Sequence, residues 1–520
     1  MSIVASSVQP LALLSIILAT IFIANILRAL FRPGLRQLPG PRLAAYSRLW
    51  NMFNAAGGNS HETFRDLHRK YGNVVRIGPN HVAIADPAMI PIIYGTNNKF
   101  LKTEFYKSFG TPYQGKMMQS MFSTLDTAQH KSLKQAVSNK FSLTTLREFE
   151  PQINSCTNKF ISIMHEFAST NEVVDLGQWL QWYAFDVVGA ITFNSLFGFM
   201  DQRKDIQDII AGIEGALWYG SIIGQMPELH PWLLANTSLM SLLSHLKAVD
   251  AANPVPKVVK MVEDAIRNYD QDSLRDRSRS DFLALFRREA EKSPERMPQR
   301  DLMNHLMNNL LAGSDTTAIS LRAIFYYLIK NPRCYKTLLQ EIETAERQGR
   351  LSVNITLTES SQMPYLQACM KEAMRLHPGV GFPLERVVPD DGLAIGDVHL
   401  PRGTIVGMNA WVIHHDKSIY GNDADDFKPE RWLIADPARL RLMEKCFLSF
   451  GAGTRTCIGK NISIMEMGKM VPQVLRNFEI SWAAPDDEWK INTFWFAKQT
   501  GVHVRFRPRT KADDERASSS

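Results

Sequence analysis

Residues 450–459 have the sequence FGAGTRTCIG, which places one cysteine between a glycine-rich loop and an apolar run that is typical of a helix. A cysteine in this position has four interpretations: a buried structural thiol, a nucleophile, a zinc ligand or a haem ligand. The chain has five cysteines. Their spacing is unpaired and contains no CxxC, which argues against a disulfide framework and a structural zinc site. Cys457 therefore needs another explanation.

Around Cys457 the chain has the spacing FxxGxRxCxG, which would arise by chance in a chain of this length about once in ten thousand. This loop resembles the haem-binding loop of the cytochrome P-450 family, the haem-thiolate monooxygenases. The resemblance implies that the Cys457 thiolate is the axial ligand of the iron of haem b. Glycines in the loop would let backbone N–H groups approach the sulfur, and Arg455 would neutralise a haem propionate. The loop residues that carry these expectations are Phe450, Gly451, Gly453, Arg455, Cys457 and Gly459.

The composition is that of a globular protein: 520 residues, 45% hydrophobic and 21% charged. No Gly/Ser linker, low-complexity tract or internal repeat divides the chain, so one large catalytic domain is expected. The net charge of +7 fits an acidic partner or an anionic membrane surface, and also simple solubility. No basic block is interleaved with aromatic residues, and nucleic acid is not an expected partner.

The N-terminus has no charged residue before Arg28, and residues 11–30 have the sequence LALLSIILATIFIANILRAL. Twenty helical residues span about 30 Å, the thickness of a bilayer core. Arginines follow at once, and positive charge stays on the cytosolic side. We expect a lumenal segment over 1–10, a single transmembrane anchor over 11–30, a Pro-rich hinge over 31–45 and a cytosolic catalytic domain over 46–520. A cleaved signal peptide is the alternative, although a basic start and a clear cleavage site are lacking.

The rest of the chain is predicted to be mostly α with small β-sheets, an α+β protein with the P-450 fold that the resemblance implies. Helical patterns dominate residues 126–286, and further helices are predicted over 301–330, 363–376 and 459–478. Short strands are predicted over 384–388, 393–400 and 404–409, with a hairpin near residue 495. His414 and His415 lie beyond these strands; as neighbours on a strand they would face opposite ways, which favours a structural role.

The sequence AGSDTT occupies residues 312–317, in the middle of the helix predicted over 301–330. A helical glycine costs about 1 kcal/mol against alanine, and the acid and hydroxyls disturb a buried helix. The motif resembles the oxygen-activation motif of the family. The resemblance implies that Gly313 leaves room for O₂, that Thr316 hydrogen-bonds the reacting oxygen and that Asp315 relays protons. Read alone, the motif is a surface acid beside back-bonding threonines.

Two further motifs, KEAMR and FKPERW, are similar to the segments that form a buried structural triad in the family. Glu372 and Arg375 lie at i, i+3 and can pair on one helical face, and Arg431 would complete the triad. Two more sites match propionate-binding positions. These are the HKSLK segment with His130 and Lys134, where the family usually has tryptophan and arginine, and Arg386 in PLERVVP. Each of these residues has an ordinary surface base or ion pair as its alternative.

The resemblance covers nearly all of the chain after the anchor, and YGNVVRIGPNHVAIADP and FYKSFG are similar to the fungal branch of pisatin-demethylase-like secondary-metabolite oxygenases. By resemblance, the substrate pocket is lined by aromatic and methionine side chains that suit a rigid apolar molecule. About half of these residues could instead be plain core. The candidates are Phe105, Tyr106, Met118, Met121, Phe122, Asn309, Val380, Phe382, Trp495 and Phe496.

The expected function is that of a monooxygenase anchored in the endoplasmic reticulum membrane. It would oxidise a lipophilic secondary metabolite, such as a terpenoid, indole alkaloid or polyketide. The chain has no nucleotide-binding motif, so electrons would come from NADPH through a separate cytochrome P-450 reductase, with cytochrome b5 as a second candidate donor. The acidic docking face of the reductase would meet basic side chains near the haem loop: Arg439, Arg441, Lys445, Lys460 and Lys469. The alternatives are an isomerase or dehydratase with the same fold and a non-enzymatic haem-binding protein.

Overall fold

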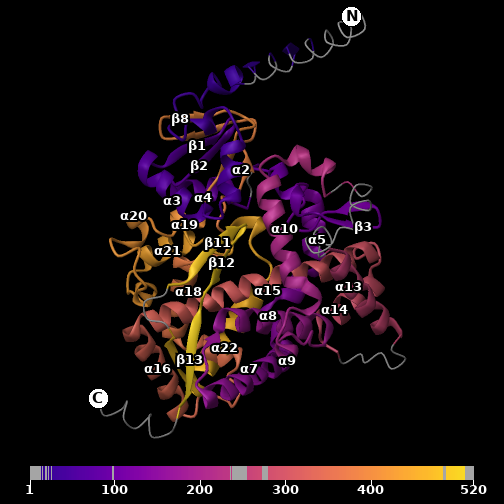
Figure 1. The fold of residues 1–520 in the computed structure, drawn as a ribbon, viewed down its shortest axis with the longest axis vertical. Helices are drawn as coiled ribbons and strands as arrows, with labels where there is room; N and C mark the ends of the chain where they lie inside the picture. The colour runs from indigo at the N-terminus through magenta and orange to yellow at the C-terminus, as the bar shows by residue number, and fades with distance from the viewer. Residues whose placement is uncertain are drawn as a thin grey trace, which may run out of the picture.

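The structure is a computed structural model. It describes residues 13, 16, 17, 20, 23, 24, 26–96, 99–234, 236, 255–271, 279–483 and 488–509. Figure 1 shows a smaller part, built on the β1–β2 sheet, at the end from which the N-terminal segment leaves, and a larger helical part beyond it.

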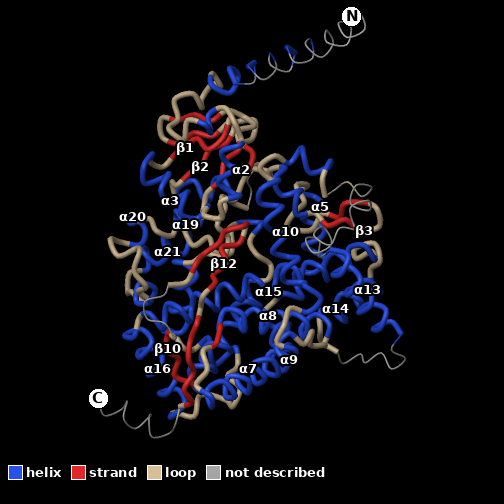
Figure 2. The backbone as a smooth tube through the Cα atoms, viewed as in Figure 1, coloured by secondary structure: helices blue, strands red, loops and turns tan. Residues whose placement is uncertain are grey.

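Helices form most of the described chain, and strands lie among them in small separate sheets (Figure 2). The longer helices are α2 (Leu49–Ala56), α3 (Ser60–Tyr71), α5 (Thr127–Val137), α7 (Glu150–Thr170), α8 (Leu176–Phe193), α10 (Ile209–Ile223), α13 (Val255–Gln271), α14 (Phe282–Lys292), α15 (Gln299–Lys330), α16 (Pro332–Arg347), α18 (Pro364–Leu376), α21 (Pro437–Lys445) and α22 (Lys460–Asn477). The mostly α prediction with small sheets is therefore confirmed.

The largest described sheet has the strand order β1-β2-β9-β6, in which β2 and β9 run parallel and the other pairs antiparallel. A second sheet has the order β10-β13-β5, and three two-stranded pairs complete the described strands. Their bounds are β1 (Val74–Gly78), β2 (His81–Ile84), β3 (Thr111–Tyr113), β4 (Lys116–Met118), β5 (Val174–Asp175), β6 (Arg386–Val387), β7 (Leu393–Ile395), β8 (Val398–Leu400), β9 (Ile405–Gly407), β10 (Phe478–Trp482), β11 (Lys490–Phe494), β12 (Phe496–Thr500) and β13 (His503–Pro508).

The main hydrophobic core lies between α7, α8, α15, α18 and α22, and a second core lies under the β1–β2 sheet. Helix α15 is 32 residues long and crosses the main core, where it packs along α8 and against α18 and α22. It begins after Pro298 and ends at Asn331, directly before Pro332. Proline disfavours helix in the residue before it, so the sequence sets this boundary.

The predicted helices over 301–330, 363–376 and 459–478 correspond to α15, α18 and α22 within two residues. The predicted strand over 404–409 is shorter, because the Asn409 side chain accepts a hydrogen bond from the backbone N–H of Trp411 and starts helix α19 (Ala410–Ile413). His414 ends that helix, so the prediction that His414 and His415 follow on a strand is wrong.

The predicted lumenal segment and nine of the 20 residues of the predicted anchor lie outside the described residues. Across the part of the chain that the structure describes, no helix is both long and apolar enough to span a bilayer. The predicted hinge packs against β1: the backbone N–H of Arg76 donates to Pro39 O at 2.8 Å. A Cβ at Gly40 would lie 2.1 Å from Arg76 O, so this close approach requires glycine there.

Candidate active site

The loop that carries Cys457 is closed by its own backbone. Cys457 N–H donates to Phe450 O at 2.9 Å, and Gly451 N–H donates to Leu448 O at 2.8 Å. Gly451 and Gly453 have φ angles of +69° and +63°, which favour glycine. A Cβ at Gly453 would lie 1.7 Å from Tyr94 O, so no side chain fits at that position. The loop ends at Gly459, where α22 begins.

The Cys457 thiol is exposed, whereas Cys156, Cys334, Cys369 and Cys446 are buried. Enclosure by the surrounding protein nevertheless raises the pKa of the Cys457 thiol, and the N–H groups of Gly459 and Lys460 act in the opposite direction. The sulfur is thus enclosed by protein and still accessible. Among the described residues no group of three or more His, Cys, Asp or Glu side chains forms a metal site. A single soft thiolate fits an iron that a porphyrin already holds.

The middle of helix α15 has positions that are not buried, although much of the helix lies in the core. Ala312 is exposed in the middle of the helix and Thr316, one turn further on, is half-buried. Thr316 Oγ1 donates to Ala312 O at 3.0 Å, which leaves its lone pairs free to accept another hydrogen bond. Exposed positions in the centre of a core helix fit a face that a large flat cofactor would cover.

Gly313 also has a packing role that the sequence did not indicate. A Cβ at this position would meet Val188 Cγ2 of α8 at 3.0 Å. The glycine therefore allows α15 to pack closely on α8, and the room for O₂ expected at this position stays a prediction.

Asp315 points into the interface between α15 and α8. Gln181 Nε2 donates to Asp315 Oδ1 at 2.5 Å, and Arg322 Nη2 donates to Gln181 Oε1 at 2.7 Å. Burial raises the pKa of Asp315, and the positive charges of Lys498 and Arg322 lower it. A buried carboxyl with a raised pKa can carry a proton within the site.

The bases predicted to bind haem propionates converge from four segments. Arg455 donates to Thr124 O at 3.0 Å, and Lys134 donates to Thr454 O at 2.8 Å. Arg386 is buried, and burial together with Arg455, Lys134 and Lys102 lowers the pKa of His130 to about 4. Within the described residues none of these bases forms an ion pair with a carboxylate. Basic side chains that lack a carboxylate among the described residues fit the two carboxylates of haem, and the neutral His130 ring can still donate a hydrogen bond to one of them.

The triad residues meet in the core. Glu372 accepts from Arg375 Nε at 2.8 Å and from Arg431 Nε at 2.7 Å, and all three side chains are buried. Trp432 Nε1 also donates to Glu372, at 2.9 Å. The Glu372–Arg375 pair was expected from their spacing and Arg431 from the resemblance to the family, but the contribution of Trp432 was not expected.

His414 links the triad to the cysteine loop. Its Nδ1–H donates to Arg375 O at 2.9 Å, and its Nε2 accepts from the backbone N–H of Leu448 at 2.7 Å. Burial lowers the pKa of His414 to about 3, so the ring is neutral and can accept. The adjacent histidines in the sequence were the only signal for this link.

Most of the predicted substrate-pocket residues lie together. Phe105, Tyr106, Phe382 and Trp495 are the buried members of an aromatic cluster, and Phe122, Val380 and Phe496 pack against them. Trp495 is the turn between β11 and β12 and has a φ of +63°, a strained conformation for a tryptophan. Two candidates lie elsewhere: Met118 belongs to the main core and Met121 packs against that core. Asn309 Nδ2 is buried and has no hydrogen-bond partner among the residues that the structure describes.

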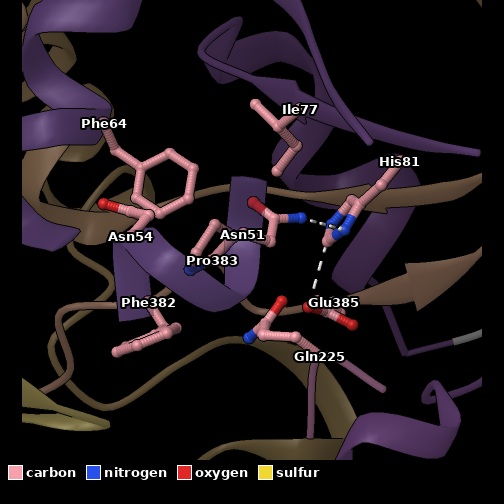
Figure 3. A pocket seen from close by; sticks show the side chains of 9 residues that line it. All are labelled: Asn51, Asn54, Phe64, Ile77, His81, Gln225, Phe382, Pro383 and Glu385. Atoms are coloured by element: carbon pink, nitrogen blue, oxygen red, sulfur yellow. Dashed lines mark hydrogen bonds and ion pairs between the residues drawn. The ribbon is translucent and has the colours of Figure 1, made fainter. Parts of the chain in front are cut away.

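Behind β6 lies a small cavity of about 10 Å³, lined by residues of α2, β2 and the segment 382–385 (Figure 3). His81 Nε2 and Glu385 Oε1 face each other there at 3.8 Å. The cavity has the volume of about one water molecule. Burial lowers the pKa of His81 to about 3 and raises that of Glu385 to about 7.

The buried Glu385 predicts that the stability of the protein falls as the pH rises from mildly acidic to neutral. The folded chain holds the Glu385 proton up to about pH 7, whereas the unfolded chain releases it near 4.5. Stability therefore falls as pH rises between these values, by about 2 kcal/mol from pH 5.5 to pH 8. Denaturant unfolding of Glu385→Gln should lack this part of the loss, while the exposed control Glu104→Gln should retain it. Equal pH dependence in wild type and Glu385→Gln would contradict the prediction.

Four of the five bases expected to meet a reductase are exposed: Arg439, Arg441, Lys445 and Lys460. The prediction for Lys469 is wrong. Its side chain is buried, where it pairs with Glu150 at 2.7 Å and donates to Ile355 O at 2.7 Å. Its place on α22 turns it toward α7 and away from solvent.

Comparison with known proteins gives concordant matches over almost the whole chain. The cytochrome P-450 family model matches residues 39–503. The cytochrome P-450 monooxygenase cicH of Emericella nidulans is 36% identical over 500 residues, which cover 96% of this chain and 99% of cicH. A pisatin demethylase of Fusarium vanettenii is 38% identical over 500 residues, covering 94% of this chain and 92% of that protein. The monooxygenase gsfF of Penicillium aethiopicum is 35% identical over 483 residues, covering 91% and 94%.

Proposed function

This chain belongs to the cytochrome P-450 family of haem-dependent monooxygenases, and we propose that it oxidises a lipophilic secondary metabolite with Cys457 as the axial thiolate. The observation that carries the proposal is the enclosed but accessible Cys457 thiol, set in a loop whose glycines admit no side chain at residue 453. The family uses haem b, and an axial thiolate favours cleavage of the O–O bond when haem is bound.

The side chains of this chain would hold the cofactor and move protons. Cys457 would bind the iron, and Arg455, Lys134, His130 and Arg386 would bind the two carboxylates. Thr316 would orient the reacting oxygen through its hydroxyl group. Asp315 would hold a proton at Oδ1 or Oδ2, because burial favours its neutral form.

Replacing Asp315 by asparagine should slow product formation by about 100-fold, since a general acid contributes 10²–10⁴-fold. Asparagine still accepts the hydrogen bond from Gln181, so the fold and the CO-bound spectrum should remain unchanged. The matched control is Asp301→Asn on the same helix, which should retain activity. Turnover is measured in H₂O and in D₂O. An Asp315→Asn enzyme with wild-type turnover would rule out the proton role.

The substrate is proposed to be a rigid apolar molecule such as a terpenoid, indole alkaloid or polyketide. The aromatic cluster supports this, because its edge-to-face rings present apolar surface with few polar groups. The relatives reported above are fungal proteins named as monooxygenases or as pisatin demethylase. Their names are consistent with a role of this chain in a secondary-metabolite pathway.

Electrons are proposed to come from NADPH through a cytochrome P-450 reductase, with cytochrome b5 as an additional donor. The exposed bases Arg439, Arg441, Lys445 and Lys460 support an acidic partner at this face. Reconstitution with reductase and NADPH, followed by metabolite comparison of a deletion strain with its parent, tests the proposal. Oxygenated product that requires both O₂ and NADPH supports it. Product formed without either one would favour the isomerase or dehydratase.

The chain is further proposed to be a single-pass protein of the endoplasmic reticulum, with the anchor over 11–30 and the catalytic domain in the cytosol. The uncharged N-terminal sequence and the arginines after it support this. Three exposed aromatic side chains support contact with lipid: Phe53 of α2, Trp218 of α10 and Trp232. An ion pair between Arg48 and Glu228 joins the start of α2 to the segment that carries Trp232. In a flotation assay, a larger fraction of the full chain than of a chain that begins at residue 31 should float with lipid vesicles.

A further inference from the structure

Asp315 belongs to a row of three buried side chains that runs from α15 to α8 and back. Gln181 Nε2 donates to Asp315 Oδ1 at 2.5 Å, and Arg322 Nη2 donates to Gln181 Oε1 at 2.7 Å. None of the three residues is more than 4% exposed. The hydrogen-bond partners around the acid are therefore set by the protein and not by bulk water.

The two helices form this row because each contributes two positions of one face. Helices α8 and α15 pack along each other (Figure 1). Asp315 and Arg322 lie at i, i+7 on α15, and Gly177 and Gln181 lie at i, i+4 on α8. Arg322 Nε and Nη2 both donate to Gly177 O, at 2.9 and 2.7 Å. A Cβ at Gly177 would lie 3.1 Å from Arg322 Nε, so the glycine leaves space for the guanidinium group.

The chemistry of arginine decides how the Gln181 amide is turned. A guanidinium group donates hydrogen bonds and cannot accept them, so the atom of Gln181 that faces Arg322 is the oxygen. The NH₂ group of Gln181 must then face Asp315 and donate to Oδ1. Because the protonated oxygen of a carboxyl group is the poorer acceptor, the proton of Asp315 belongs on Oδ2.

The charges around Asp315 leave Arg322 as the cation behind this amide. Burial raises the pKa of Asp315, Lys498 of β12 and Arg322 lower it, and Glu214 of α10 raises it. Lys498 and Glu214 form an ion pair with each other. Arg322 forms no ion pair with a carboxylate in the described ranges of the chain, and its hydrogen bonds go to neutral acceptors. Its positive charge polarises the Gln181 amide and strengthens the hydrogen bond to Oδ1.

We propose that Gln181 is a positioning residue for the proton step of this enzyme and that Arg322 fixes its orientation. Gln181 keeps Oδ1 of Asp315 as an acceptor, so the transferable proton stands on Oδ2. When the acid acts, the O–H bond at Oδ2 breaks and the proton leaves through water toward the oxygen that Thr316 orients. The carboxylate keeps its hydrogen bond from Gln181 until a proton from solvent restores the acid. The proposal rests on the proton role proposed for Asp315 and deepens it.

The test exchanges the donor that faces Asp315. Gln181→Glu keeps the size of the side chain and the acceptor for Arg322, but it replaces the NH₂ group by an oxygen. Two facing carboxyl groups then share one proton, which is drawn away from Oδ2. Gln178→Glu is the control, because Gln178 is an exposed residue of the same helix. Gln181→Glu combined with Asp315→Asn reverses the pair, with the amide donor on α15 and the acceptor on α8.

Three quantities are measured on the haem-loaded enzymes: turnover with reductase and NADPH, the denaturation midpoint, and the infrared C=O band of the protonated acid. The band is obtained as the difference from the matching Asp315→Asn variant and is followed against pH.

Gln181→Glu should form product about tenfold more slowly than wild type, because the acid no longer presents its proton on Oδ2. Its infrared band should persist to higher pH, because the shared proton is held more tightly. Gln178→Glu should match wild type in all three quantities. The double variant should recover the stability lost in Gln181→Glu but keep the low turnover of Asp315→Asn. A structural role alone would not move the infrared titration.

A wild-type infrared titration in Gln181→Glu would overturn the proposal, whether turnover is slow or not. If Gln181→Glu gives no folded chain, the double variant decides: a folded double variant supports the reversal of donor and acceptor, and one that also fails to fold overturns it. Wild-type turnover in Asp315→Asn would instead refute the proton role in the proposed function. The infrared titration still reports on Gln181 in that case, so the two failures are distinguishable.

Discussion

Cys457→Ser is expected to abolish both the CO-bound Soret band of a haem-thiolate protein and all turnover. Serine is nearly isosteric, so the loop can close as before, but its hydroxyl group is not deprotonated near neutral pH and is a poor ligand for iron. The measurements are the reduced, CO-treated spectrum, the haem content and product formation with reductase and NADPH.

Cys446→Ala is the matched control. Cys446 precedes the same loop but is buried, with a pKa raised to about 11 by burial. This variant loses some apolar packing and should keep both the spectrum and the activity. A Cys457→Ser enzyme that retains the thiolate band would refute Cys457 as the ligand, and retained turnover would refute the proposed chemistry.

Glu372→Gln is expected to remove a large part of the stability of the protein. The carboxylate accepts hydrogen bonds from Arg375, Arg431 and Trp432 and from the backbone N–H of Lys428. Among the described residues, loss of the charge leaves the buried Arg375 guanidinium without a carboxylate and Arg431 with Asp423 alone. The cost is about 3–5 kcal/mol, against a typical total stability of about 5–15 kcal/mol. The denaturation midpoint should fall and the yield of haem-loaded protein should drop sharply.

Glu444→Gln provides the comparison for this effect. Glu444 pairs with Lys371 at the surface, where an ion pair contributes about 0–1 kcal/mol. If the two variants unfold at the same denaturant concentration, the triad does not have the proposed structural role. If Glu372→Gln remains stable but loses haem, the role of the triad is confined to the cysteine loop.

The sequence predicted the boundaries of α15 and α18 because prolines block the helix at each end, and such signals are local. The Glu372–Arg375 pair was predictable because the two residues are one helical turn apart. Arg431 and the cysteine loop were predicted from motifs that resemble those of the family. The contacts that fix them, Arg431 with Glu372 and Gly453 with Tyr94, join distant parts of the chain.

The expectation for Lys469 failed because it depended on packing between distant segments, and Lys469 pairs with Glu150 in the core. The roles expected for Gly313 and Met118 stay predictions. Gly313 meets Val188 of α8, and Met118 belongs to the main core. Side-chain type alone does not indicate which neighbour covers a residue, because this depends on how helices far apart in the chain cross.

By itself, the sequence determined the family, the thiol that would bind iron and the helices that carry the acid and the hydroxyl group. Only the tertiary structure paired Leu101 with Val387 and placed the Glu385 carboxylate against Thr103 and His81. The reason is the register between two segments that are far apart in the chain: a shift of one residue would exchange the side chains on the two faces, and no local pattern specifies that shift.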